Sequence, residues 1–386
     1  MYGNKKLNNP FVTTGYAGPE YFCDRETESR KLIEALRSGR NMALISLRRM
    51  GKTGLLKHLG FLLQKQKEKK ELIYIDLLPT QSASDMLSML GTALLHTRHK
   101  GKNPLEKIIS SLSSLRPGLS YDSLSGQPSL VFTVVNEQDF NMGFRHLLSL
   151  FDSIRNEPII VFDEFQQIRD YPEKNAEALL RTIMQENPQI RFIFSGSDKH
   201  MMEGIFTLAN RPFYQSVEMM YLGPVPAANY REFIRGHFSD AKFAIADAEI
   251  DEIIAWCRNH TFYIQYFCNR LFDSAAPVIN HEMLHQVSLE ILSSYEPLYL
   301  SYQRLLTDHQ FSLLRAIAVE NGVTRPLSGD FISKYQLKGA SSVKTSLVAL
   351  SGKQMLIEID KAWVVYDVFF ARWLEHTWRL VNIWKA

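Results

Sequence analysis

The chain has 386 residues, of which 45% are hydrophobic and 22% are charged, and its formal net charge at pH 7 is +3. A chain of this length exceeds one ordinary hydrophobic core, so we expect two or three domains. The small net charge neither requires nor excludes a nucleic-acid partner. The three cysteines, Cys23, Cys257 and Cys268, are odd in number and widely spaced. They exclude a disulfide framework and a cysteine metal site, which favours a reducing compartment.

The N-terminal segment Met1–Pro10 is polar and lacks the apolar run of a signal peptide. No stretch of the sequence approaches the roughly 20 apolar residues that a membrane span needs. We therefore expect a cytoplasmic protein with no membrane partner.

Short apolar runs alternate with helical patterns in the first part of the chain. The runs that predict buried strands are Met42–Ile45, Leu72–Leu77, Pro158–Phe162 and Arg191–Ser195. The helical patterns are Thr53–Glu68, Ser84–Arg98, Phe140–Ile154 and Ala176–Glu186. This alternation predicts a parallel sheet in a three-layer α/β domain over residues 1–225. Residues 104–129 are rich in Ser, Gly and Pro and predict an exposed insertion in that domain.

After Gly223 the strand patterns stop. Amphipathic helical patterns predict an all-α domain over residues 226–304, with helices at Ala227–His237, Asp247–Arg258, Tyr263–Phe272 and His281–Tyr302. From residue 305 to residue 386 the pattern changes to three helices and a β-hairpin. These elements are Asp308–Glu320, Gly329–Tyr335, Ser341–Leu350, Leu356–Ile359 and Trp363–Tyr366. Three helices followed by a hairpin is the order of a winged-helix domain.

The turn after the first predicted strand carries a phosphate-binding pattern. Gly51-Lys52-Thr53 lies between that strand and a helix, as a P-loop requires. Backbone N–H groups at a helix N-terminus attract phosphate oxygens, while Lys52 reaches the β- and γ-phosphates and the Thr53 hydroxyl ligates Mg²⁺. Ser46 stands where the first glycine of the pattern belongs, so the motif alone leaves a chance Gly-Lys-Thr open. We assign ATP or ADP binding to Ser46, Arg48, Arg49, Met50, Gly51, Lys52, Thr53 and Gly54.

Two acids follow the third predicted strand. Asp163 is placed to hold Mg²⁺ together with Thr53, and Glu164 is placed to orient and deprotonate the attacking water. The two acids taken alone are equally compatible with a helix cap beyond a buried strand. Because both motifs follow strands in the right order, they predict a nucleotide site together. Ser195 or Ser197, at the end of the fourth strand, is a candidate sensor of the γ-phosphate, although a simple serine-rich turn remains open.

Several segments carry a resemblance to a known family. They are Asn9–Phe11, Tyr21–Glu26, Arg48–Thr53, Phe194–Ser197, Asn259–Gln265 and Tyr366–Leu374. With them the chain resembles the archaeal-type P-loop ATPases, a STAND/AAA+-related family, over nearly its whole length. The resemblance implies an ATPase core, a helical lid and a C-terminal winged helix. It also implies that Arg25 or the backbone near Gly15–Tyr16 lies by the adenine, and that Arg211 senses phosphate or pairs in an oligomer.

The sequence departs from this family at two places. Asn259–Gln265 lacks the glycine and the proline of the family's lid motif, which puts the lid contacts in doubt, and Val368 replaces a proline near the chain end. Ser341–Leu350, the predicted recognition helix, has Lys344 as its only cation, and the hairpin adds Lys353 and Lys361. DNA is therefore a weakly supported partner, because phosphate contacts supply most of the affinity for it. A role as a lid, as a homo-oligomer contact or as a docking surface for a protein partner fits this domain better.

We expect an ATPase that couples Mg²⁺-dependent ATP hydrolysis to a conformational switch. One alternative is a nucleotide-locked signalling or adaptor module with negligible turnover, and Glu164 argues against it. The other alternative is a DNA-binding regulator switched by ATP, which a basic surface around Lys344 would favour.

Overall fold

The computed structural model describes residues 7–97, 118–121, 128–133, 137–150, 156–274 and 276–383. The described residues form two compact units. The first contains Thr14–Val225, and the second contains Pro226–Ala386 together with Lys5–Thr13, as far as these ranges are described. The division of the second unit into a lid and a winged-helix domain at residue 305 stays a prediction.

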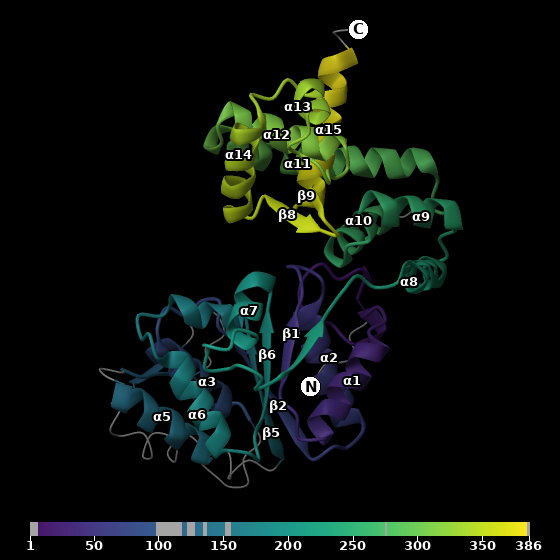
Figure 1. The fold of residues 1–386 in the computed structure, drawn as a ribbon. Helices are drawn as coiled ribbons and strands as arrows, with labels where there is room; N and C mark the ends of the chain where they lie inside the picture. Colours follow the sequence, from purple (N-terminus) through teal and green to yellow (C-terminus); the bar gives the residue numbers. More distant parts are fainter. Residues whose placement is uncertain are drawn as a thin grey trace. The chain divides into compact units, whose positions relative to one another are not determined.

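A parallel sheet of five strands forms the centre of the first unit (Figure 1). In spatial order the strands are β2 (Lys70–Asp76), β5 (Glu157–Asp163), β6 (Arg191–Gly196), β1 (Met42–Ile45) and β7 (Glu218–Tyr221). All four pairings between neighbours are parallel. The strand β6 therefore lies between the strand of the phosphate-binding pattern and the strand of the two acids. The sequence predicted four of these strands and missed the edge strand β7.

Both faces of the sheet are buried under helices, because alternate strand residues point to opposite sides. Met42 and Leu44 of β1 pack with α1 (Glu26–Arg37) and α2 (Lys52–Lys65). Ala43 and Ile45 belong to the core on the other face. The helices of that face are α3 (Ala83–Leu95), α5 (Glu137–Ser149), α6 (Ala176–Glu186) and α7 (Lys199–Phe206) (Figure 1). This arrangement is a three-layer α/β domain, and the predicted fold class is confirmed.

Part of the predicted insertion forms a hairpin. Gly118–Tyr121 (β3) pairs antiparallel with Pro128–Val131 (β4). Residues 104–117 and 122–127 lie outside the described residues. The backbone N–H of Leu130 donates to Thr92 Oγ1 at 2.9 Å, which attaches β4 to α3. The side chains of β3 are exposed along its whole length.

The second unit begins with helices and ends with the order of a winged helix. Its first helices are α8 (Ala227–Asp240), α9 (Asp247–Trp256), α10 (Thr261–Asp273) and α11 (His281–Leu305). Its later elements are α12 (Asp308–Val319), α13 (Gly329–Lys334), α14 (Ala340–Gly352), β8 (Leu356–Ile359), β9 (Ala362–Val365) and α15 (Val368–Ile383). Thr307 caps α12 in a capping box with Gln310, and Val323 bridges to Trp363 beside the hairpin. Each predicted element of this unit is present, and α15 is an additional helix that the sequence did not predict.

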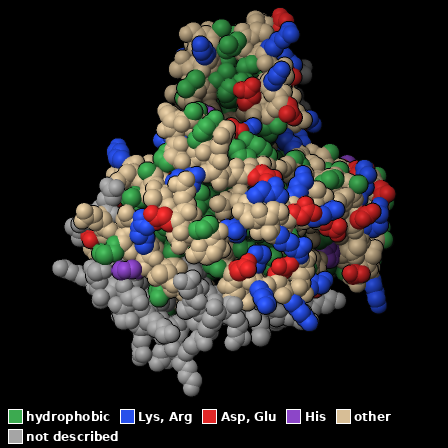
Figure 2. Space-filling view, turned by 60° about the horizontal axis from the view of Figure 1, so that its bottom comes forward, with side chains coloured by type: hydrophobic (Ala, Val, Ile, Leu, Met, Phe, Trp, Pro, Cys, Tyr) green, Lys and Arg blue, Asp and Glu red, His purple; other side chains and the backbone are tan. Residues whose placement is uncertain are grey.

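Charge is mixed on the face of the molecule that Figure 2 shows. Figure 2 shows Lys and Arg side chains interspersed with Asp and Glu side chains on the face in view, in line with a net charge of +3. Within the described ranges, no helix combines the length and the apolar character that a membrane crossing would require. Cys23, Cys257 and Cys268 are all buried as free thiols.

Candidate functional site

The loop between β1 and α2 has the shape of a phosphate-binding turn. Gly51, the residue before α2, has a φ of 93°, in the left-handed region that favours glycine. No side chain caps the start of α2, and no acid lies in its first turn. The first N–H groups of a helix have no partner within it, and the helix dipole adds positive potential there. This end of α2 is therefore suited to an anion.

Serine at position 46 is accommodated by burial and hydrogen bonds. Its backbone N–H donates to the carbonyl of Gly196 at 3.3 Å, and its hydroxyl donates to the carbonyl of Leu47 at 2.9 Å. Further along the loop, Arg48 and Arg49 are exposed, whereas Met50 is buried. The loop thus keeps its attachment to β6 without a glycine at its first position.

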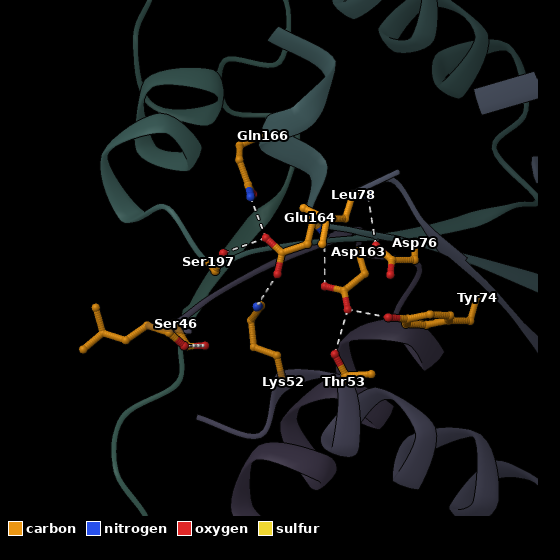
Figure 3. A network of polar contacts seen from close by, with 11 residues as sticks. Ser46, Lys52, Thr53, Tyr74, Asp76, Leu78, Asp163, Glu164, Gln166 and Ser197 are labelled. Atoms are coloured by element: carbon orange, nitrogen blue, oxygen red, sulfur yellow. Dashed lines mark hydrogen bonds and ion pairs between the residues drawn. The ribbon is translucent and has the colours of Figure 1, made fainter. Parts of the chain in front are cut away.

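Asp163, at the end of β5, receives two hydroxyl donors on the same oxygen. Thr53 Oγ1 donates to Asp163 Oδ2 at 2.9 Å, and the Tyr74 hydroxyl donates to it at 2.5 Å (Figure 3). Burial of Asp163 favours its neutral form, but the charge of Lys52 and the nearby hydroxyls of Tyr74, Ser195 and Thr53 outweigh burial. The pKa of Asp163 is therefore lowered below its usual range.

Glu164 follows directly and has both carboxylate oxygens bonded. Its backbone φ of 52° is left-handed, which is uncommon for a residue other than glycine. Lys52 Nζ lies 3.2 Å from Oε1. Ser197 Oγ donates to Oε2 at 2.6 Å and Gln166 Nε2 donates to Oε2 at 2.5 Å (Figure 3). The carboxylate is thus fixed between the start of α2 and the end of β6.

A third carboxylate, Asp76, ends β2 beside the other two. Asp76 pairs in register with Asp163 across the two strands. Asp76 Oδ1 accepts a hydrogen bond from the backbone N–H of Leu78 at 3.0 Å. Burial raises the pKa of Asp76, and the charges of Asp163 and Glu164 act in the same direction. Asp76, Tyr74 and Gln166 were not predicted from the sequence as site residues.

The two candidate serines, Ser195 in β6 and Ser197 just after it, occupy different environments. Ser195 is fully buried, and its hydroxyl has no hydrogen-bond partner of standard geometry, although it lies near enough to Asp163 to help lower the pKa of that carboxyl. Ser197 is 8% exposed and contacts Glu164. Of the two, Ser197 is the one bonded to the site carboxylates, and the assignment of Ser195 as a phosphate sensor stays a prediction.

Arg25 forms hydrogen bonds with backbone carbonyls around the phosphate-binding loop. Its guanidinium donates to the carbonyls of Met50 at 3.2 Å and Gly223 at 2.8 Å, and it pairs with Glu28 at 2.9 Å. Its side chain is 3% exposed, so it braces the loop against the end of β7. Its predicted place by the adenine is not tested by these contacts.

Arg211 forms an ion pair with Glu177 of α6. Burial raises the pKa of Glu177, against the opposing charges of Arg211 and Arg169. The predicted phosphate contact of Arg211 therefore competes with an internal partner and stays a prediction. At the start of α2, Gly54 leaves room for the Phe22 ring, because an added Cβ would lie 3.1 Å from it.

Known proteins resemble this chain in fold, and one region matches a known family. A family model described as a probable winged helix domain matches residues 297–376. None of the curated proteins matches the sequence. The fold is similar to that of the Walker-type ATPase PABY2304 of Pyrococcus abyssi, with a TM-score of 0.64 at 19% identity over 95% of this chain and 99% of that chain.

Two structures from Aeropyrum pernix are also similar. The ORC2 protein has a TM-score of 0.55 at 13% identity, over 93% of each chain. The ORC1 protein, solved in complex with DNA, has a TM-score of 0.52 at 14% identity, over 97% of this chain and 98% of that chain. The chain therefore has the fold of archaeal Walker-type ATPases and ORC proteins, followed by a winged helix. The resemblance indicated by the sequence is confirmed at the level of the fold.

Proposed function

We propose that this chain binds ATP with Mg²⁺ and hydrolyses it, and that hydrolysis drives a conformational switch. The observation that carries the proposal is the meeting of two motifs at one end of the sheet. Lys52 lies 3.2 Å from Glu164, and Thr53 lies 2.9 Å from Asp163. A phosphate-binding cation and a metal-binding hydroxyl from the start of α2 thus meet two carboxylates at the end of β5, as phosphoryl transfer requires.

The start of α2 is proposed to hold the phosphates. Its N-terminal backbone N–H groups and the Lys52 ammonium are donors for phosphate oxygens, and Gly51 lets the chain turn closely around them. Thr53 and Asp163 supply a hydroxyl and a carboxylate, the oxygen ligands that suit Mg²⁺. Mg²⁺ bound there would neutralise charge that develops on the phosphate oxygens.

Glu164 is the proposed general base. Its carboxylate lies beside Lys52, where the terminal phosphate would be bound, so it can orient a water and accept its proton. Phosphate that attracts Lys52 would leave Glu164 Oε1 without its present donor. The base would then become available only when a nucleotide phosphate is in place.

Glu164→Gln is the test of hydrolysis, because the amide keeps the size and loses the basic oxygen. We expect phosphate release to fall on the order of 10²-fold or more. The matched control is Glu157→Gln at the other end of β5, where the carboxylate pairs with Lys70 at 2.6 Å. Equal slow turnover in the wild type and in Glu164→Gln would reject hydrolysis and favour the nucleotide-locked module.

For the winged helix we propose a protein partner or a second copy of the chain. Val348 on α14 is 68% exposed and Ile359 at the end of β8 is 41% exposed. Apolar side chains on these two elements suit a protein surface better than a phosphate backbone. The ORC1 structure was solved with DNA, so DNA remains the alternative that a binding titration of the whole chain decides.

A further inference from the structure

We infer that Gln166 is a positioning residue for Glu164, and that it fixes which carboxylate oxygen acts on water. The inference rests on the proposed hydrolysis. Gln166 lies in the 3-10 helix η4 (Phe165–Asp170), which begins directly after Glu164. Its amide is one of two neutral donors to the Glu164 carboxylate, and the other is the Ser197 hydroxyl.

The two oxygens of Glu164 have different kinds of partner. Gln166 Nε2 and Ser197 Oγ both donate to Oε2, at 2.5 and 2.6 Å. Only Oε1 contacts Lys52, at 3.2 Å. Phosphate is an anion and competes most strongly for the charged donor, Lys52. Oε2 is therefore the anchored oxygen, and Oε1 is the oxygen that accepts the proton from water.

Gln166 is held in place by its surroundings. It is 8% exposed, and its Oε1 is buried without a hydrogen-bond partner. It packs against Gly196, where an added Cβ would lie 2.5 Å from Gln166 Oε1 and 2.4 Å from Met202 Sδ. Glycine at position 196 thus makes room for the amide. A buried oxygen without a hydrogen bond destabilises the fold. Its presence is consistent with a role for the N–H side of the same amide.

Glu164 lies between the end of β5 and the start of η4, at a left-handed φ of 52°. A flexible carboxylate there would sample several rotamers, and a displacement of about 1 Å can cost on the order of 10²-fold in rate. Two short hydrogen bonds to one oxygen remove that freedom.

The test compares two neighbouring glutamines. Gln166→Met keeps the length of the side chain and removes the donor to Glu164. The control Gln167→Met removes a similar amide, whose Nε2 donates at 3.2 Å to the carbonyl of Thr80 instead. We expect Gln166→Met to lower kcat by at least about tenfold, with no rise in KM for ATP, while Gln167→Met keeps both. Equal kcat in the two variants would overturn the inference, as would a fall in kcat that is matched by a rise in KM.

A second measurement tests the position of the Glu164 carboxylate and does not depend on ATP turnover. In a crystal structure of nucleotide-free Gln166→Met, the Glu164 carboxylate should leave its contacts with Ser197 and Lys52. An unmoved carboxylate would overturn the inference. If Gln166→Met does not fold, Gln166→Leu also removes the amide donor to Oε2 and should produce the same displacement and the same loss of kcat. A wild-type protein that binds ATP without turnover would reject the proposed hydrolysis alone, because the crystal structure would still decide the role of Gln166.

Discussion

The ion pair between Lys52 and Glu164 predicts that a change in the acid alters nucleotide affinity as well as turnover. The pair is largely buried, with 6% and 18% of the two side chains exposed. ADP must draw Lys52 away from Glu164 before the ammonium can bind a phosphate. The Glu164→Gln variant replaces the carboxylate by a neutral amide and so weakens the competing contact. It should bind Mg–ADP more tightly than the wild type does.

The size of the effect follows from the kind of bond that is lost. Hydrogen bonds to an ionised partner are about twice as strong as neutral ones, so the change releases about 1 kcal/mol, or about fivefold in the dissociation constant. Titration calorimetry with ADP measures it without interference from hydrolysis. The control is Glu157→Gln, which breaks the pair with Lys70 at the opposite end of β5 and should leave ADP affinity unchanged. Unchanged or weaker ADP binding by Glu164→Gln would refute the competition.

Three further predictions follow from the same contacts. Lys52→Ala should abolish ADP binding in calorimetry while the circular dichroism spectrum stays that of the wild type. The lowered pKa of Asp163 stabilises the fold at pH values above the unfolded-state pKa of about 3.9. This stabilisation is lost as the pH falls through the folded-state pKa of Asp163. Tyr74→Phe, which removes a donor to Asp163, should therefore cost about 1–2 kcal/mol in urea unfolding at neutral pH, and the cost should shrink below about pH 4. The whole chain should bind duplex DNA weakly, with a salt slope of about two or three phosphates; tight, salt-sensitive binding that Lys344→Glu abolishes would contradict this.

The buried strands of the sheet could be predicted because each is a continuous apolar run. The edge strand β7 was missed because Met220 is its only buried residue. Its apolar residues therefore form neither a continuous run nor a clean alternation with polar residues. The last helix, α15, begins with buried side chains at four consecutive positions, 368–371. Such a run hides the helical period until the packing partners are known. The tertiary surroundings, not local propensity, decide both elements.

The pairing of Thr53 with Asp163 could be predicted from the motifs, because parallel strands end at the same edge of a sheet. Tyr74 and Asp76 could not, since no sequence pattern says that β2 lies beside β5. Once that neighbour is known, the register of Asp76 with Asp163 places both residues at the site. Gln166 is two residues from a recognised acid, yet an amide in a turn has no distinctive pattern of its own.

The charges at the end of β5 explain why most hydrogen-bond donors there are neutral. Three carboxylates lie around a single ammonium, and burial opposes the charge on two of them, Asp76 and Asp163. Further cations would neutralise the carboxylates and compete with a metal ion, whereas neutral donors bond the oxygens and leave their charge in place. The donors to Asp163 and Glu164 other than Lys52 and the backbone are neutral side chains, namely Thr53, Tyr74, Gln166 and Ser197. The site thus keeps an excess of negative charge, which suits the divalent cation of the proposed function.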